Sequence, residues 1–371
     1  MYAKIHDKRF RNNLLLLALL FMFLVILSAC GGAAATEEPA APAQPAATEV
    51  PAEPVEPEQQ YPVQYGQDSR TELFQHPDSK LKEMATSVAI FVHSSQVNIS
   101  GDAVTLEGYT LNQMSEMGWL VGGVQAPMCS NELFTSQPAP GFCTGFLVDE
   151  DILVTAGHCL QKTPCADTSV VFGFQMDSPD SLATLTISNV FKCTEVIAQV
   201  LPDQNNQLLD YAIIKLDRPT GRVGLDYAAE DHLEAQNNVA VLGHPSGLPM
   251  KIASDAYILS NQADNPFFVT NLDTFGSNSG SPVINLDTYQ VEGILVRGEV
   301  DYVLSSDNSC IQVNRCPESG DTNCSGENAT KMAVLADLIP AGAATDPNGL
   351  SCFPTLLFVF AVPALMRLKP R

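Results

Sequence analysis

Short apolar runs separated by turns follow one another through most of this chain, and they constrain its fold more than any other feature. Helical patterns of roughly 10–15 residues, which would indicate crossover helices, do not separate these runs. Such a succession predicts an all-β protein, either a sandwich or a barrel. The expected strands are Val88–Val92, Gly145–Val148, Ile152–Thr155, Val170–Phe174, Val196–Leu201, Tyr211–Leu216, Val239–Leu242, Phe267–Val269, Val283–Asn285 and Val291–Val296.

The end of the expected domain has a different pattern. In Glu327–Ile339 the apolar residues Met332, Val334, Leu335 and Leu338 recur at helical spacing, which predicts one short late helix. We therefore expect a folded domain over residues 61–340 that is β-rich until this helix at 327–339.

The N-terminus has the pattern of an export signal. Residues 1–13 carry four cations, and Leu14–Leu27 is apolar and uncharged. This run is shorter than the roughly 20 residues of a membrane-spanning helix, as signal peptides are. Its end, Leu27-Ser28-Ala29-Cys30-Gly31, resembles the lipobox of bacterial lipoproteins, which implies cleavage after residue 29 and lipid on Cys30. The alternative is an ordinary signal peptide, and export follows from either.

Two further segments flank the expected domain. Residues 30–60 are rich in Pro, Ala, Thr and Glu and cannot bury enough apolar surface to fold, so we expect an extended tether. Residues 341–371 consist of a spacer, the apolar run Leu350–Leu368 and a basic end. This tail resembles the C-terminal sorting tails of some exported bacterial proteins and would be a second membrane anchor; the alternative is a buried terminal element.

Charge and cysteine content exclude some classes of protein. The formal net charge of −23 argues against nucleic-acid binding, which needs a basic surface. Eight of the ten cysteines lie between residues 129 and 324, and an even set of this kind predicts disulfides formed in an oxidising compartment. Because no C-x-x-C pair occurs, we expect no metal site.

Three motifs along the chain point to nucleophilic catalysis. His158 lies in Thr155-Ala156-Gly157-His158-Cys159, directly after an expected strand, and a Cys143–Cys159 disulfide would hold that turn against the neighbouring strand. Asp210 directly precedes the expected strand at residues 211–216, and Ser279 lies in the polar segment Asn271–Pro282. Taken alone, that segment is either an ordinary turn or a nucleophile loop.

Together, these motifs resemble the signatures of the chymotrypsin-like (trypsin-type) serine proteases. The order His, Asp, Ser is that of the family, and Asn278-Ser279-Gly280-Ser281-Pro282 resembles the bacterial branch near the glutamyl endopeptidases. The resemblance covers roughly residues 65–338. It implies two six-stranded antiparallel β-barrels, one at about 80–218 and one at about 219–326, with the active site between them.

The resemblance assigns a role to each motif. His158 would accept the proton of the Ser279 hydroxyl, and Asp210 would orient the imidazole. The backbone N–H groups of Ser277 and Ser279 would form the oxyanion hole. Most family members have glycine where this chain has Ser277. The backbone there would need a positive φ, which is strained for serine. The position therefore raises the question of whether the Ser277 N–H points into the oxyanion hole.

The resemblance also indicates a specificity pocket. Asp273, six residues before Ser279, would lie at its base and favour a basic substrate residue; the alternative is an aspartate that caps a turn. Thr274 matches the pocket threonine of glutamyl endopeptidases, but Leu295 stands where their histidine would be. Arg297, on the expected pocket-wall strand, would pair with Asp273 or meet an acidic substrate group. The balance favours a basic substrate residue.

These expectations combine into one functional prediction. The chain would be an exported, membrane-tethered serine endopeptidase that acts on peptide or protein substrates without a cofactor. Its membrane contacts would be the lipid on Cys30 and the C-terminal tail. The alternative is a lipoprotein with the same fold, which binds a partner while its catalytic residues are idle, since one fold serves many functions.

Overall fold

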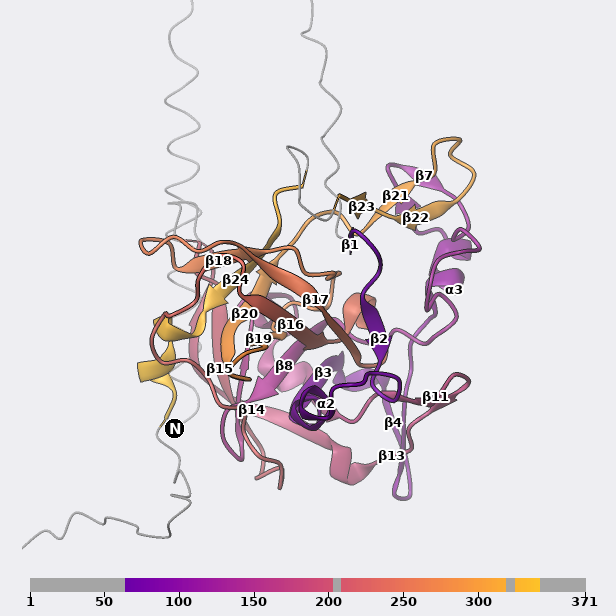
Figure 1. Cartoon of the computed structure of the whole chain (residues 1–371). Helices are drawn as coiled ribbons and strands as arrows, with labels where there is room; N and C mark the ends of the chain where they lie inside the picture. The colour runs from indigo at the N-terminus through magenta and orange to yellow at the C-terminus, as the bar shows by residue number, and fades with distance from the viewer. Residues whose placement is uncertain (1–63, 203–207, 318–323, 341–371) are drawn as a thin grey trace, which may run out of the picture. The chain divides into compact units, whose positions relative to one another are not determined.

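The computed structural model of the protein describes residues 64–202, 208–317 and 324–340 (Figure 1). The expected signal peptide, Cys30, the tether up to residue 60 and the apolar tail Leu350–Leu368 lie outside the described residues. Within the described residues, no helix is both long and apolar enough to cross a membrane.

Six antiparallel strands form a first closed barrel, in the order β10-β14-β15-β9-β8-β3. Strand β8 lies between β3 and β9, so the segment that carries Cys143 pairs with the strand that leads to His158. Most side chains of β3, β8, β9, β10 and β15 are buried, as expected for apolar runs that fill a small barrel. The strands are β3 (Val88–His93), β8 (Cys143–Leu147), β9 (Ile152–Thr155), β10 (Thr168–Phe172), β14 (Val190–Val200) and β15 (Tyr211–Leu216).

A second barrel follows in the order β16-β19-β20-β24-β18-β17, and pairing of β16 with β17 closes it. The short strand β2 (Arg70–Glu72) adds to β17 outside this ring. The strands are β16 (Asn238–Gly243), β17 (Lys251–Ser260), β18 (Phe267–Thr270), β19 (Pro282–Asn285), β20 (Val291–Arg297) and β24 (Glu327–Lys331). The predicted all-β class with two six-stranded antiparallel barrels is therefore confirmed.

The predicted helix at 327–339 is wrong over its first half. Glu327–Lys331 is strand β24, which pairs with β18 and β20 and completes the second barrel. Only two short 3₁₀ turns follow, Met332–Val334 and Ala336–Leu338. The second barrel therefore ends at residue 331 rather than 326, because without β24 the backbone groups of β18 and β20 would lack their partners.

Smaller elements surround the barrels. In the described part of the chain the α-helices are α2 (Ser79–Ala85), α3 (Leu111–Glu116) and α4 (Cys159–Lys162). Further 3₁₀ helices are Ser94–Gln96, Cys165–Asp167, Ile187–Asn189 and Pro245–Gly247. Several short strands pair outside the barrels. Strand β5 (Ala103–Leu106) lies between β4 (Val97–Ser100) and β13 (Leu185–Thr186). The other pairs are β1 (Gln64–Tyr65) with β23 (Arg315–Cys316), β6 (Leu120–Val121) with β7 (Val124–Gln125), β11 (Met176–Ser178) with β12 (Ser181–Leu182), and β21 (Tyr302–Leu304) with β22 (Ile311–Val313).

All eight cysteines of the domain form disulfides. The pairs are Cys129–Cys310, Cys143–Cys159, Cys165–Cys193 and Cys316–Cys324. The expected Cys143–Cys159 bond is present, and it joins β8 to the start of α4. Cys129–Cys310 connects two segments whose cysteines are 181 residues apart in the sequence.

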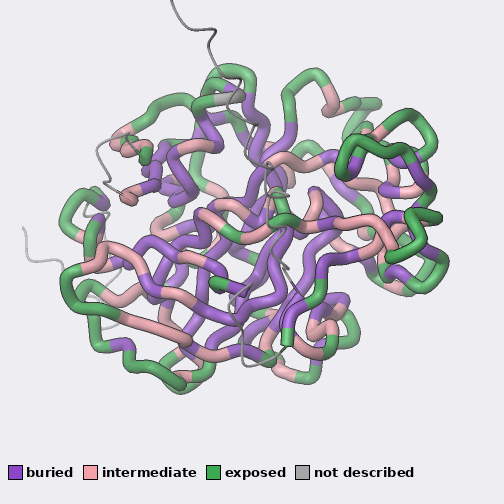
Figure 2. Tube along the Cα trace, turned by 90° about the horizontal axis from the view of Figure 1, so that it is seen from above, coloured by how far each residue is buried: buried purple, intermediate pink, exposed green. Residues whose placement is uncertain are grey.

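One large apolar core joins the two barrels. It includes Phe91 and Ile213 of the first barrel and Leu242 and Ile294 of the second, all of which are buried. Figure 2 shows the buried residues concentrated along the central strands, with exposed residues in the peripheral loops. Because this core is continuous, residues at the ends of strands from both barrels are held in a defined arrangement between them.

Candidate active site

His158 lies where β9 turns into the short helix α4. The residue before it has to be glycine, since a Cβ at Gly157 would stand 2.1 Å from the carbonyl oxygen of Val200. The Gly157 carbonyl accepts a hydrogen bond from the side chain of Gln199, 2.8 Å away. The His158 side chain is about 30% exposed, so its ring is open to solvent on one side.

Asp210 is buried and directed at His158. Its Oδ2 lies 2.7 Å from His158 Nδ1, and its Oδ1 accepts a 3.0 Å hydrogen bond from the His158 backbone N–H. Its own carbonyl accepts a bond from the hydroxyl of Thr330 in the second barrel. Because the carboxylate is an acceptor, the imidazole carries its proton on Nδ1 and leaves Nε2 free.

Ser279 comes from the second barrel but is bonded to the first. Its carbonyl accepts a 2.9 Å hydrogen bond from the Thr144 N–H on β8 and lies 3.6 Å from the Sγ of Cys159. Gly280 follows with φ +90°, and a Cβ there would stand 2.0 Å from the Thr144 carbonyl oxygen. The nucleophile loop therefore packs directly against the strand that is disulfide-bonded to the histidine turn.

The hydroxyl of Ser279 and the imidazole of His158 do not form a hydrogen bond within the described residues. The expected triad thus consists of a formed His158–Asp210 pair with Ser279 positioned beside it. Hydrogen bonds of this kind are often long in unliganded proteases and tighten when substrate binds.

Hydrogen bonds hold the carbonyl of the Gly276–Ser277 peptide and the peptides on either side of it. The Gly276 carbonyl accepts a 2.6 Å hydrogen bond from the Ser246 N–H, and the Gly276 N–H donates to Asp301 Oδ2 at 2.7 Å. The Ser277 carbonyl accepts from the Thr144 hydroxyl at 2.9 Å. In a trans peptide the carbonyl and the next N–H point in opposite directions, so the Ser277 N–H is directed away from Ser246.

Two N–H groups of this loop are free to bind a ligand. Among the described residues, no group accepts a hydrogen bond from the N–H of Ser277 or from that of Ser279. The intervening Asn278 N–H donates to the Phe275 carbonyl at 3.0 Å. The loop therefore presents two unpaired donors that flank a paired one.

A cavity of about 340 Å³ opens next to Ser279. Three of the four predicted pocket residues, Thr274, Leu295 and Arg297, line it. Arg297 does not pair with Asp273 among the described residues; its guanidinium donates to the Leu208 carbonyl at 3.0 Å and lies over the ring of Phe267.

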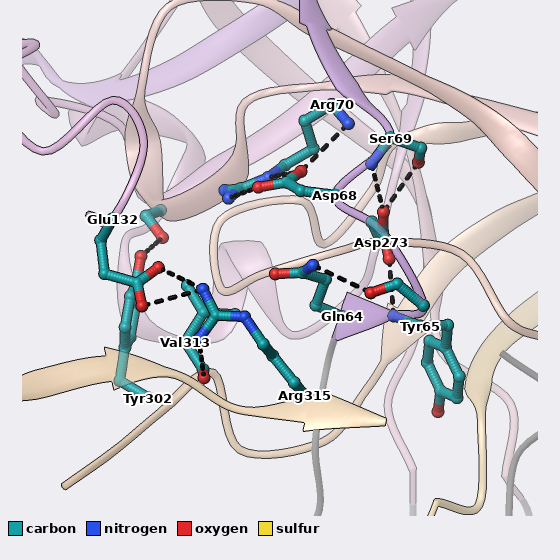
Figure 3. A network of polar contacts seen from close by, with 12 residues as sticks. Gln64, Tyr65, Asp68, Ser69, Arg70, Glu132, Asp273, Tyr302, Val313 and Arg315 are labelled. Carbon is teal, nitrogen blue, oxygen red and sulfur yellow. Dashed lines mark hydrogen bonds and ion pairs between the residues drawn. The ribbon is translucent and has the colours of Figure 1, made fainter. Parts of the chain in front are cut away.

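The prediction that Asp273 forms the base of this pocket is wrong. Figure 3 shows its carboxylate directed at the N-terminal segment, where it accepts hydrogen bonds from the backbone N–H groups of Tyr65 and Ser69 and from the Ser69 hydroxyl. These distances are 2.7, 2.7 and 2.8 Å. The side chain thus anchors residues 65–69, which is closer to the alternative reading of a capping aspartate, and burial raises its pKa to about 6.

Three carboxylates that the sequence did not indicate line the cavity instead. They are Glu299, Asp301 and Glu327. Burial raises the pKa of Asp301 to about 7 and raises that of Glu327 well above its ordinary value. Glu327 could have been noticed as a charged residue at the start of an apolar segment, but nothing along the chain connects it with Ser279.

Other supporting residues were also missed. Thr144 and Ser246 hold the nucleophile loop from outside it. A polar residue within the fully buried strand β8 is a signal for Thr144, because a buried hydroxyl needs hydrogen-bond partners. Ser246 has φ +54°, a conformation that no sequence pattern indicated.

Among the described residues, one group of potential metal ligands lies at this site. A ligand atom of each of Cys143, His158 and Cys159 falls within 4.8 Å of the others. Both sulfurs are bonded to each other, however, so they are not thiolates that could bind a metal.

Residues 143–294 match the family profile of the trypsin-like peptidase domain. The matched segment runs from strand β8 into β20 and contains His158, Asp210 and Ser279. Over this segment the chain is therefore similar to trypsin-like peptidase domains.

Several solved structures resemble the chain at low sequence identity. A glutamyl endopeptidase structure is 17% identical, with a TM-score of 0.41, and the match covers 75% of this chain and 97% of the other. The VesB protease of Vibrio cholerae is 13% identical, with a TM-score of 0.43, and the match covers 75% of this chain and 66% of the other. Human heparin-binding protein is 17% identical, with a TM-score of 0.38, and the match covers 54% of this chain and 84% of the other. A search of curated proteins found no match. Because these TM-scores are below 0.5, the fold assignment rests on the strand pairings described above.

Proposed function

We propose that this protein is a serine endopeptidase with His158, Asp210 and Ser279 as its triad. One observation carries the proposal: His158 Nδ1 lies 2.7 Å from the buried Asp210 carboxylate, at a turn packed against the loop that contains Ser279. The trypsin-like peptidase profile over the same segment supports it.

The chemistry follows from the proton positions. With Nδ1 bonded to Asp210, the free Nε2 of His158 takes the proton of the Ser279 hydroxyl as its oxygen attacks the substrate carbonyl carbon. The resulting imidazolium, stabilised by Asp210, gives that proton to the leaving amine, and an acyl-enzyme remains. Water then attacks the ester with His158 again as base, which releases the acid and restores Ser279.

The two unpaired N–H groups supply the electrostatic part. As the carbonyl oxygen becomes negative, the N–H groups of Ser277 and Ser279 donate to it without first giving up an internal partner. Donors held in place in this way need no reorganisation during the reaction, which is the main benefit of such a site.

Labelling with a fluorophosphonate probe tests the proposal. The probe reacts with an activated serine, so we expect the wild-type protein to be labelled and Ser279→Ala to remain unlabelled. Ser130→Ala, at an exposed loop serine, is the matched control and should be labelled like the wild type. Mass spectrometry of the labelled peptide identifies the modified residue.

The second candidate is a partner-binding protein with the same fold and an idle triad. The lack of a Ser279–His158 hydrogen bond in the described residues favours it. Folded wild-type protein, with the expected circular dichroism spectrum, that does not react with the probe would overturn the enzyme proposal in favour of this one.

We further propose that the enzyme is exported and held to a membrane by lipid on Cys30, with the tail Leu350–Leu368 as a second anchor. The basic start, the apolar run and the lipobox-like end support this. In a bacterial host we expect the wild type in the membrane fraction and Cys30→Ser in the soluble exported fraction. Retention of Cys30→Ser, with release only when residues 350–371 are also deleted, would assign anchoring to the tail.

A further inference from the structure

The Gly276 carbonyl accepts a hydrogen bond from outside its own loop. The donor is the backbone N–H of Ser246, 2.6 Å away, in the 3₁₀ helix Pro245–Gly247 between β16 and β17. This carbonyl belongs to the same peptide as the Ser277 N–H, one of the two donors of the nucleophile loop that have no partner among the described residues. The two groups of a trans peptide point in opposite directions, so whatever holds the Gly276 carbonyl also directs the Ser277 N–H.

Ser246 itself has a backbone conformation that serine seldom adopts. Its φ of +54° lies in the left-handed region, which is unfavourable for a residue with a Cβ. Such conformations persist only where the surrounding structure enforces them, and they cluster at functional sites. The side chain of Ser246 makes a contact that can enforce this one, since its hydroxyl lies 2.7 Å from the hydroxyl of Tyr302.

Tyr302 is fixed by the elements around it. It begins β21, lies opposite Val313 of β22 and is 6% exposed. Its ring meets that of Trp119 edge-on, with 5.0 Å between the ring centroids, and the centroid of the Phe275 ring lies 5.7 Å away. Burial raises the pKa of the Tyr302 phenol, which therefore keeps its proton. Its hydroxyl is thus a fixed point to which Ser246 is bonded.

The hairpin of β21 and β22 is tied to a second segment of the chain. Cys310, directly before β22, forms a disulfide with Cys129. The carbonyl of Ile311 accepts a hydrogen bond from the Cys129 N–H, and its N–H donates to the Pro127 carbonyl, both at 2.8 Å. These bonds restrict the movement of the hairpin and therefore that of the Tyr302 hydroxyl.

The residue before Tyr302 holds the other side of Gly276. Asp301 Oδ2 accepts a 2.7 Å hydrogen bond from the Gly276 N–H. Two consecutive residues therefore fix Gly276, one directly through its N–H and the other through Ser246 and the Gly276 carbonyl. Tyr302 and Ser246 do not line the described cavity beside Ser279, so this hydrogen bond acts on the loop rather than on a substrate side chain.

We propose that Tyr302 is a positioning residue for the oxyanion hole. Through Ser246, its hydroxyl holds the Gly276 carbonyl and keeps the Ser277 N–H directed at the oxygen that becomes negative when Ser279 attacks. The inference rests on the proposed peptidase function. Without the Tyr302 hydroxyl, Ser246 is free to leave its strained conformation, and the Gly276–Ser277 peptide loses the bond that orients it.

Tyr302→Phe tests this inference, because it removes the hydroxyl and keeps the ring. The substrate is a fluorogenic peptide selected from a library for cleavage by the wild type. Loss of an oxyanion donor lowers kcat by roughly 10²–10³-fold, so a donor that is only less well held should cost less. We expect kcat to fall about 5- to 30-fold and KM to stay within about twofold of the wild type.

Tyr289→Phe is the matched control. The Tyr289 hydroxyl also donates a single described hydrogen bond, to Asp78 at 2.9 Å, and Asp78 is the N-cap of α2. This variant loses the same kind of bond away from the nucleophile loop, so its kcat and KM should both equal those of the wild type.

Ser246→Ala removes the same hydrogen bond from its other side. It should lower kcat by a similar factor, so the test does not depend on the folding of one variant. Because both changes break one bond, the double variant should be at most about twofold slower than the slower single variant. The rate of fluorophosphonate labelling should fall in parallel with kcat, since the phosphonyl oxygen binds where the substrate oxygen does.

Thermal unfolding checks that each variant is folded. A folded Tyr302→Phe variant with the kcat of the wild type would overturn this inference, as would a loss confined to KM or effects of the two changes that multiply. The peptidase proposal would stand in each case, because the wild type is active. Folded wild-type protein that neither reacts with the probe nor cleaves any peptide of the library would overturn the peptidase proposal itself.

Discussion

Ser277 holds a backbone conformation that serine seldom adopts. Its φ of +70° lies in the left-handed region, which is roughly 1–2 kcal/mol unfavourable for a residue with a Cβ. Its hydroxyl donates to the Gly141 carbonyl at 3.2 Å, and its own carbonyl accepts from Thr144. These bonds offset the strain, so Ser277 keeps a backbone conformation that glycine adopts readily.

We expect Ser277→Gly to retain kcat/KM within about threefold of the wild type, since glycine adopts positive φ freely and the lost hydrogen bond is worth only about 1 kcal/mol. Ser277→Val should lower kcat by roughly 100-fold, because a β-branched residue would distort the loop and misplace an oxyanion donor. Peptide hydrolysis measures both, and thermal unfolding checks that the variants fold. Equal activity of the two variants would contradict this role of the Ser277 backbone.

Strand β24 illustrates how an element differs from its local pattern. The helical spacing in this region came from Met332, Val334, Leu335 and Leu338, which lie in two 3₁₀ helices and the turn between them. The five residues before them form a strand because β18 and β20 offer backbone partners on both sides. Barrel closure therefore overrides a weak local preference.

The N-terminal segment is a second element whose role was not visible in the sequence. Residues 65–69 are fixed by Asp273, three residues before Gly276, and β2 continues onto β17. Arg70 then packs over Phe275, the neighbour of Gly276. This segment thus supports the wall of the cavity from behind, and Asp273 contributes to the pocket indirectly.

At the scale of the whole molecule, the site exists only where the two barrels meet. Thr144 of the first barrel donates to the Ser279 and Ser277 carbonyls, and Thr330 of the second donates to the Asp210 carbonyl. The backbone N–H of His244, just after β16, donates a hydrogen bond to the Thr144 hydroxyl, and the residue is 1% exposed. Its Nδ1 pairs with the Leu248 carbonyl, while Nε2 has no partner among the described residues.

His244 predicts how stability depends on pH. Burial lowers its pKa to about 3, below its ordinary 6.5, so below pH 6.5 the unfolded chain binds a proton that the folded protein does not. At roughly 1.4 kcal/mol per pKa unit, the folded state loses on the order of 3–5 kcal/mol as pH falls from 6.5 towards 3. Asp273 and Asp301, whose pKa values are raised, act in the opposite direction.

A comparison of variants therefore isolates this histidine. We expect His244→Asn, whose amide can still donate to the Leu248 carbonyl, to lose less unfolding free energy between pH 7 and pH 4 than the wild type. His232→Asn, at an exposed histidine, should follow the wild-type curve. Urea unfolding at each pH gives the free energies, and parallel curves for His244→Asn and the wild type would refute the prediction.

Local signals carried much of the prediction. The apolar runs marked most barrel strands, and the Thr-Ala-Gly-His-Cys turn marked His158 together with its disulfide. The long strand β17 and the small peripheral pairs were missed, since β17 includes Lys251 and Asp255 and lacks a clear apolar run. Lys251 is buried there because Glu72 and Gln137 contact its amino group.

The sequence by itself determined the β-rich class, the set of cysteines available for disulfides, and the order of His158, Asp210 and Ser279, because each depends on neighbours along the chain. Only the tertiary structure decided what lines the cavity and what Asp273 binds. The cavity is built from residues 274–276, 279, 295–299, 301 and 327, which no local pattern connects. Their proximity depends on closure of the second barrel by β24, and that closure brings Glu327 next to Thr274.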